Sequence, residues 1–245
     1  MMNIPLRIGI FSIFILCLNT IHVSAENLSQ KLQGRKLIEN SLNNGDLTAL
    51  SRILPEGESE NLIYQYREFI ESFPNSNWTV NSKYTSNKNE EIIYINVNGS
   101  KKLGSQTLQL SGKQSIKVLY SKNRILNKEI ISSESMLTTF KNKAPFLINI
   151  PDNALTGSIY EIDIIYNKPL ENSILAGGLI YINNNELKQY ISPRIEIEPL
   201  AAGGLFKQVK APQSPGKQNW AALIAHPDGL ISITKTVNIV DGITN

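Results

Sequence analysis

The sequence predicts two domains of different fold class after a short N-terminal segment. Residues 26–140 are expected to form an α+β domain of helices packed on a curved antiparallel sheet, and residues 141–245 an all-β sandwich. Two observations predict this division. Apolar residues change from helical spacing to strict alternation near Trp78, and no helical spacing survives beyond about Phe140. With 245 residues, 41% hydrophobic and 18% charged, the chain can bury a core.

Residues 1–25 have the order of a secretory signal peptide and are left out of the predicted fold. One basic residue, Arg7, precedes the apolar run IGIFSIFILCL, and small residues then lead to an expected cleavage site after Ala25. We therefore expect an exported protein, in the periplasm or the thylakoid lumen. The alternative is a protein anchored in the membrane by this segment when it is left uncleaved.

Cleavage after Ala25 would limit the chemistry of the mature chain. It removes Cys17, the only cysteine, and His22, which leaves His226 as the only histidine. Disulfides and thiolate catalysis are then excluded, and we predict no metal site, cofactor or catalytic residue. The net charge of +3 falls by one with Arg7, and no basic tract favours nucleic-acid binding.

Residues 26 to about 74 are predicted to form three helices. The first carries an apolar face of Leu28, Leu32, Ile38 and Leu42. Gly45 is expected to end it, and Asp46 can cap a second helix that Pro55 ends. Ser59 can cap the third helix, which ends before Pro74. Its apolar stripe consists of Leu62, Tyr66, Phe69, Ile70 and Phe73.

Alternating apolar residues predict strands from Trp78 onward. In EIIYINVNGS, Ile93, Ile95 and Val97 share one face, and Asn98–Gly99 is expected to form a turn. Lys122–Asn123 is expected to form the turn between two further strands. About seven short strands follow in the second domain, separated by proline and glycine, which is typical of a sandwich. The expected segments are PFLINIP, YEIDIIYN, ILAGGLIYI, YISPRIEIEPL, LFKQVKAP, WAALIAHP and GLISITKTVNIV.

Three helices with the segment NGDLTALSRIL, followed by long antiparallel strands, resemble the NTF2-like cone fold over about residues 28–139. The second half resembles an immunoglobulin-like sandwich over about 142–241. The whole pattern, with its GGLFK and HPDG stretches, also resembles an uncharacterised family of exported cyanobacterial proteins. The NTF2-like resemblance implies a concave pocket or dimer surface. That fold serves isomerases, dehydratases and binding modules alike, so the fold alone does not choose among these functions.

Acidic and tyrosine side chains of the third predicted helix are the candidates for enzymatic chemistry. Glu68 and Glu71 are three residues apart and can share a helix face, near Glu60, Tyr64 and Tyr66. If the pair lies buried in a cone, its two carboxyl groups could act as acid and base. The other interpretation is a solvated helix face opposite the apolar stripe.

The glycine-rich stretch LAAGGLFK places Gly203 and Gly204 before Lys207, and LAGGLIYI is similar. Neither has the spacing of a phosphate-binding loop, and no helix is predicted to follow. We interpret these glycines as bulges or as points of close backbone approach.

Five residues are candidates for contact with a partner. Phe206 and Trp220 are either core residues or exposed aromatic anchors, and Lys207 follows Phe206. His226 and Asp228 can form a base with its orienting acid, but Pro227, Asp228 and Gly229 have the chemistry of a tight turn. We favour the turn, since no serine nucleophile motif accompanies them.

The sequence therefore predicts an exported binding or assembly protein without enzymatic activity. Its expected partner is a protein or an envelope component, with no nucleic acid and no membrane contact beyond an uncleaved signal segment. The alternative is an isomerase- or dehydratase-like enzyme that uses carboxylates in an NTF2-like cone. The sequence sets no oligomeric state.

Overall fold

The computed structural model describes residues 28–49, 59–87, 90–121, 124–171, 173–183 and 194–242. The chain divides into two compact units. The N-terminal unit ends at Ser133 and the C-terminal unit begins at Glu134. Strand β4 (Arg124–Thr138) contributes to both units because the division falls within it. The predicted signal segment, residues 1–25, lies outside the described residues.

The N-terminal unit begins with helices whose ends follow the predicted signals. Those with printed bounds are α1 (Leu28–Asn44) and α3 (Ser59–Ser72). Gly45 follows α1 with a φ of 66°, the left-handed conformation that glycine adopts at helix ends. Asp46 Oδ1 accepts a hydrogen bond from Ala49 N at 2.8 Å, which confirms its capping role. No helix among the described residues is long and apolar enough to cross a membrane.

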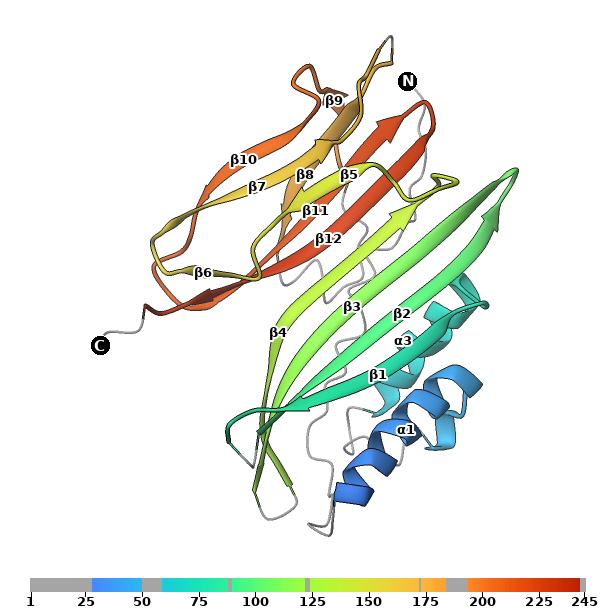
Figure 1. The fold of residues 1–245 in the computed structure, drawn as a ribbon, viewed down its shortest axis with the longest axis vertical. Coiled ribbons are helices and arrows are strands. Elements are labelled where there is room, and N and C mark those ends of the chain that lie inside the picture. The colour runs from blue at the N-terminus through green and yellow to red at the C-terminus, as the bar shows by residue number, and fades with distance from the viewer. Residues whose placement is uncertain are drawn as a thin grey trace. The chain divides into compact units, whose positions relative to one another are not determined.

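Long strands form the rest of the N-terminal unit, in the order β1–β2–β3–β4 (Figure 1). The first three are β1 (Asn77–Tyr84), β2 (Glu90–Leu103) and β3 (Gln106–Ser121). β2 pairs antiparallel with both of its neighbours. One sheet face is buried, and Val80, Ile95 and Gln114 form a row across it. The predicted shared face of Ile93, Ile95 and Val97 is confirmed.

The predicted turn at Asn98–Gly99 is wrong, because β2 continues through both residues to Leu103. The chain turns instead at Gly104, whose φ is 61°. Gly99 has a packing role, since a Cβ atom added there would lie 3.3 Å from the Cβ of Phe73. The other predicted turn, at residues 122–123, lies outside the described residues.

The expected fold class is wrong. The chain is 58% strand and 13% helix, its two sheets are mainly antiparallel, and the described residues form no α+β domain of NTF2-like type. Helical spacing predicted the positions of the helices. It did not predict that strands of 14 to 16 residues would make up most of the unit. α1 also meets β1 at the strand's edge, where Asn43 and Glu39 accept hydrogen bonds from backbone N–H groups of the strand.

The C-terminal unit consists of strands in two sheets. Their bounds are β5 (Phe146–Asn149), β6 (Asn153–Leu155), β7 (Ile159–Tyr166), β8 (Ala176–Ile182), β9 (Glu198–Pro199), β10 (Gly204–Lys210), β11 (Gly216–His226) and β12 (Gly229–Val240). One sheet has the order β4–β12–β11–β8–β9, with β6 parallel to β12, and the other has the order β10–β7–β5. Of the predicted strand YISPRIEIEPL, residues 190–193 lie outside the described residues. In the described part, 194–200, only β9 pairs, so the predicted strand is too long.

The core of the C-terminal unit lies between its two sheets. The predicted alternation in β7 is confirmed, because Tyr160, Ile162, Ile164 and Tyr166 are all buried. The opposite sheet contributes Trp220, Ala222, Ile224, Ile231, Ile233, Val237 and Ile239 to the same cluster. Burying such aliphatic side chains contributes about 1.5–3 kcal/mol each, so this layer is the main stabilising element of the unit.

Glycines in the two glycine-rich stretches allow close backbone approach, as the sequence predicted. A Cβ atom at Gly178 would lie 1.9 Å from the carbonyl oxygen of Glu196, and one at Gly204 would lie 2.6 Å from that of Ile164. Gly203 has a φ of 73°, which a side chain would strain. These positions therefore serve packing and turning.

We predict that Gly178→Ala lowers the free energy of unfolding by at least about 1 kcal/mol, because the added methyl group must displace backbone. The measurement is urea denaturation followed by tryptophan fluorescence. The control is Gly216→Ala, since nothing lies within 4 Å of a Cβ atom there. Equal stability of the two variants would contradict the close approach at Gly178.

Candidate functional site

Trp220, a predicted partner-binding candidate, is buried in the core of the C-terminal unit. Its Nε1 donates a hydrogen bond to the hydroxyl oxygen of Tyr160 at 2.9 Å, and that hydroxyl donates to Gln218 Oε1 at 2.7 Å. Burial raises the pKa of Tyr160, and the hydrogen bond from Trp220 partly offsets this rise. These bonds join β7 to β11 across the core, and they pair the polar atoms that burial removes from water.

Lys207 and Tyr181 pack against the ring of Trp220. The Lys207 Nζ lies 5.5 Å from the ring centroid, within the range of a cation–π contact. Tyr181 lies directly opposite Trp220 in the β8–β11 pairing, and its ring meets the indole edge at 5.7 Å. The indole is therefore enclosed by side chains of its own unit, and Lys207 and Tyr181 keep their outer parts in water.

His226 and Asp228 lie at a hairpin corner, which confirms the predicted turn. β11 ends at His226, β12 begins at Gly229, and these two residues pair. The His226 side chain is only 5% exposed and stacks on Tyr166 at 4.7 Å between ring centroids. Phe140 lies on the same ring at 6.2 Å. The imidazole is thus part of an aromatic cluster at this end of the core.

One of the two ring nitrogens of His226 is engaged within the hairpin corner. Nδ1 accepts a hydrogen bond from the backbone N–H of Asp228 at 3.2 Å, so it carries no proton in this arrangement. The Asp228 carboxylate lies 3.6 Å from the same atom and becomes an ion-pair partner only if the ring is protonated. Burial, followed by the charges of Asp228 and Glu171, raises the pKa of the neighbouring Tyr166.

Phe206 differs from the other aromatic candidate because it is 54% exposed. It belongs to the outer side of the sheet β10–β7–β5, where Leu147 is 59% exposed. Leu147 pairs with Ile165, Ile165 pairs with Gly204, and the ring of Phe206 extends over Gly204. Leu147, Ile165 and Phe206 therefore form an apolar group across three strands, which we name the Phe206 face.

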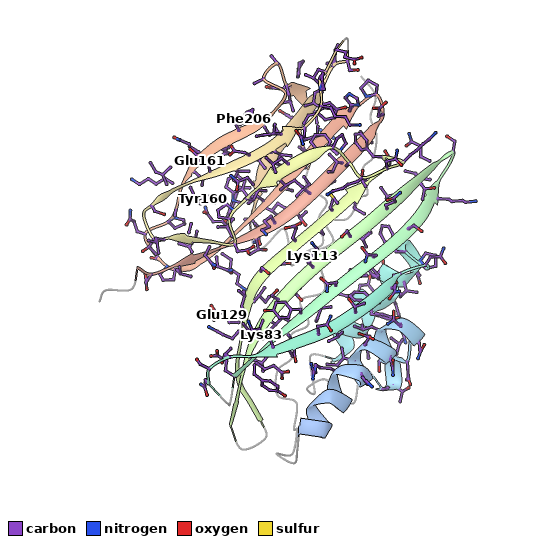
Figure 2. All side chains as sticks on the ribbon, in the orientation of Figure 1. Lys83, Lys113, Glu129, Tyr160, Glu161 and Phe206 are labelled. Atoms are coloured by element: carbon purple, nitrogen blue, oxygen red, sulfur yellow. The ribbon has the colours of Figure 1, made fainter. Side chains whose placement is uncertain are left out.

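Carboxylates border the Phe206 face and are held by amide side chains. Gln208 Nε2 donates to Glu161 Oε1 at 3.2 Å, and Asn149 Nδ2 donates to Asp163 Oδ2 at 3.4 Å. Glu161 and Phe206 are both labelled in Figure 2. An apolar centre with an oriented polar border is the usual composition of a binding surface.

The candidate acids Glu68 and Glu71 of the third predicted helix lie in water. Glu68 and Glu71 are exposed on α3, as is Tyr64. Tyr66 is buried, and its hydroxyl donates to the carbonyl oxygen of Leu42 at 2.5 Å. Burial raises its pKa. The interpretation of Glu68 and Glu71 as a solvated helix face agrees with this placement, and the side chain of Glu60 lies outside what the structure describes.

Two buried polar residues in the N-terminal unit, Glu91 and Gln114, were not predicted from the sequence. Glu91 accepts a hydrogen bond from the hydroxyl of Ser82. Gln114 has both amide atoms buried, with no partner among the described residues. Glu91 shares the face of Ile93 and Ile95, so the two-residue spacing could have placed it inward. The same spacing in β3 places Gln114 on the face of Leu110 and Ile116, so it could also have been placed inward.

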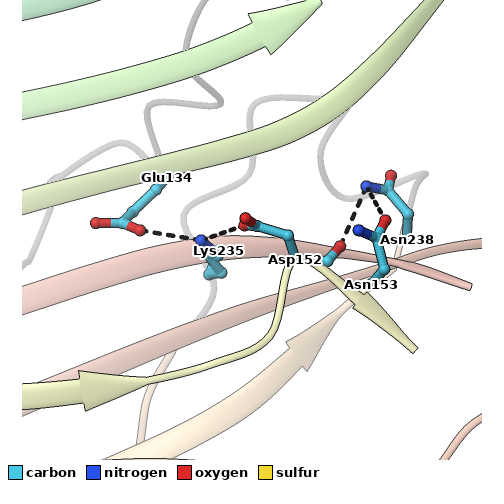
Figure 3. A network of polar contacts seen from close by, with 5 residues as sticks. All are labelled: Glu134, Asp152, Asn153, Lys235 and Asn238. Carbon is cyan, nitrogen blue, oxygen red and sulfur yellow. Dashed lines mark hydrogen bonds and ion pairs between the residues drawn. The ribbon is translucent and has the colours of Figure 1, made fainter.

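A second missed feature is a charged network in the C-terminal unit (Figure 3). Lys235 has a side chain only 10% exposed, and its Nζ lies 3.0 Å from Glu134 Oε2 and 2.6 Å from Asp152 Oδ1. Burial lowers the pKa of Lys235, but its hydrogen bonds to Asp152 and Glu134 outweigh that effect, so the pKa is raised. The network joins β12, β4 and the segment between β5 and β6.

Asn238 extends this network at its other end. Its Nδ2 donates to the backbone oxygen of Asp152 at 3.2 Å and lies 3.4 Å from Asn153 Oδ1. The segment that leads into β6 is thereby held against β12 by both backbone and side-chain bonds. Across the described ranges, no group of three or more His, Cys, Asp or Glu residues could hold a metal ion.

Comparison with known proteins gives one match to a family model. Residues 141–240 are similar to a domain of unknown function, DUF8623. A search of curated proteins gives no match. The matched residues include the Phe206 face, Trp220 with its hydrogen-bond partner Tyr160, and the hairpin corner at His226.

We predict that Lys235→Met lowers the free energy of unfolding by about 1–2 kcal/mol at neutral pH. The loss is smaller than for a fully buried ion pair, because Glu134 and Asp152 are 35% and 50% exposed to water. The pKa of Lys235 is raised above its ordinary value of 10.5 in the folded protein. The stabilisation by its charge is therefore complete below pH 10.5, and it is lost as the pH rises through the pKa of the folded state.

Urea denaturation of the wild type and the variant at a series of pH values measures the effect. The exposed Lys101→Met is the control. A difference between wild type and Lys235→Met that persists undiminished above the folded pKa would contradict the role of the Lys235 charge.

Proposed function

We propose that this chain is an exported, non-enzymatic binding or assembly protein, and that the Phe206 face binds its partner. The observation that carries the proposal is the exposure of Phe206 and Leu147 beside Ile165 on one side of the sheet β10–β7–β5. Folded chains seldom leave several large apolar side chains together in water, and such groups mark contact surfaces. A protein or an envelope component with an apolar anchor is the partner that fits.

The polar border supports a specific contact on the Phe206 face. Glu161 and Asp163 are held in place by Gln208 and Asn149, so their orientation is set before a partner arrives. Fixed polar groups around an apolar centre reduce the entropy lost on binding. Of the five sequence candidates, Phe206 is the contact residue in this proposal, whereas Trp220 and His226 support the sheet from inside.

The distribution of reactive groups supports a non-enzymatic function. Glu68 and Glu71, the acids on which the enzymatic alternative depended, are exposed on α3. Nδ1 of His226 is taken by the N–H of Asp228. The α+β cone that would have enclosed those acids is absent from the fold. We therefore do not propose the isomerase- or dehydratase-like alternative.

We predict that a photo-reactive phenylalanine analogue at position 206 of the full chain forms a covalent adduct with the partner in the native host. The control places the same analogue at position 64, because Tyr64 is similarly exposed but lies on α3. Gel electrophoresis with mass spectrometry identifies the adduct. Adducts of the same identity and yield at both positions, or none at position 206, would contradict the proposal.

Once the partner is known, Phe206→Ser is expected to weaken its binding by at least about tenfold, as loss of an aromatic anchor does. Tyr64→Ser should leave the affinity unchanged. Because both side chains are exposed, neither change should alter the free energy of unfolding by more than about 0.5 kcal/mol.

Export is the second part of the proposal, and it depends on the signal-like order of residues 1–25. We predict that intact-mass measurement of the protein from its host gives a chain that begins at Glu26. A full-length chain in the membrane fraction would support the anchored alternative, and a full-length chain in the cytoplasm would contradict export altogether.

A further inference from the structure

Strand β1 lies at the end of the sheet order in the N-terminal unit, and among the described residues no strand pairs with its outer edge. Backbone groups alternate along a strand, so Trp78 and Val80 direct their N–H and C=O groups to the same edge. β2 occupies the other edge. An edge strand of eight residues is a template for pairing with another chain.

Two side chains of α1 occupy this edge. Asn43 Oδ1 accepts the N–H of Trp78 at 2.8 Å, and Asn43 Nδ2 donates to the carbonyl oxygen of Trp78, also at 2.8 Å. Glu39 Oε2 accepts the N–H of Val80 at 2.7 Å. The amide of Asn43 therefore supplies one acceptor and one donor to a single residue, as a paired residue of an antiparallel strand does.

The spacing of Glu39 and Asn43 along α1 lets both side chains reach the edge of β1. Glu39 and Asn43 are four residues apart and lie on one face of α1, while Trp78 and Val80 are two residues apart along β1. The remaining hydrogen of Asn43 Nδ2 is bonded to the carbonyl oxygen of Glu39 at 3.0 Å, which holds the amide in place. Figure 1 shows α1 beside β1.

The composition of β1 would let a second copy pair with it. The strand NWTVNSKY contains neither proline nor glycine, and its only charge is Lys83. In the antiparallel register that sets Val80 opposite Val80 of the second copy, Trp78 lies opposite Ser82, so edge-directed residues face each other. Thr79 then lies opposite Asn81, and Asn77 lies opposite Lys83, so no like charges meet.

We propose that Glu39 and Asn43 guard the edge of β1 against pairing with a second copy of this chain. Their hydrogen bonds take the positions that the second copy's β1 would use, and removing them opens a two-fold antiparallel pairing of β1 with β1. Because β1 has one free edge, this pairing stops at a dimer.

The test is the oligomeric state of the full chain with Glu39→Ala and Asn43→Ala, measured by light scattering after gel filtration. The matched control is Asn40→Ala with Asn44→Ala, a pair with the same spacing on an exposed part of α1. We expect the guard variant to form a dimer at concentrations at which the control keeps the mass of the wild type. A folded guard variant with the mass of the control, or one that forms larger species, would overturn the proposal.

Charged residues introduced at Thr79 and Asn81 test the register, because these two positions lie opposite each other in it. Both side chains are exposed, so the strand can accept the substitutions. In the guard variant, Thr79→Lys with Asn81→Lys sets like charges opposite each other, whereas Thr79→Lys with Asn81→Glu sets opposite charges together. We expect the Lys/Glu pair to dimerise roughly tenfold more tightly than the Lys/Lys pair. Equal dimerisation would overturn the pairing of β1 with β1.

Hydrogen exchange keeps the proposal testable if the guard variant does not fold. In the single variant Asn43→Ala, the amide of Trp78 should exchange at least about tenfold faster than in Asn44→Ala. Equal exchange of this amide in the two variants would show that Asn43 does not protect the strand, and would overturn the proposal.

Discussion

A strand is stable only when the N–H and C=O groups along its two edges are paired or reach water, and this requirement governs a chain that is 58% strand. Inside the sheets, neighbouring strands meet the requirement. At the outer edge of β1, the side chains of Glu39 and Asn43 accept hydrogen bonds from backbone N–H groups of the strand. At β10, which ends the other sheet, Lys207 and Lys210 are exposed, and lysine is a common means of discouraging edge pairing.

The same requirement applies to polar side chains that burial removes from water. In the C-terminal unit, Trp220, Tyr160 and Gln218 satisfy one another, and Lys235 is paired with two carboxylates. Each of these bonds also joins segments that are far apart in the chain, so pairing of polar groups and packing of the core support each other. Gln114 is one exception among the described residues, because its buried amide has no partner there.

Local signals predicted the places where elements begin, end and turn. Gly45 ends α1, Ser59 begins α3, and the corner at Pro227 and Asp228 joins β11 to β12. These features depend on residues close together in the chain. Asn98–Gly99 failed as a turn signal because a distant residue, Phe73, requires the glycine for close contact.

The candidate site was predicted only in part. Aromatic character selected Phe206 and Trp220 equally, and the structure exposes one of them and buries the other. Leu147 and Ile165 looked like ordinary strand residues. They join Phe206 only because β5 and β10 pair on either side of β7, and that pairing depends on residues far apart in the chain.

By itself, the sequence determined the helix ends, the alternation in β7 and the hairpin at His226, because spacing and turn chemistry act within a few residues. The tertiary structure alone decided the fold class, the exposure of Phe206, the pairing of Lys235, and the placing of Asn43 on the edge of β1. Each of these depends on which distant segment lies opposite a side chain, and a local pattern does not carry that information.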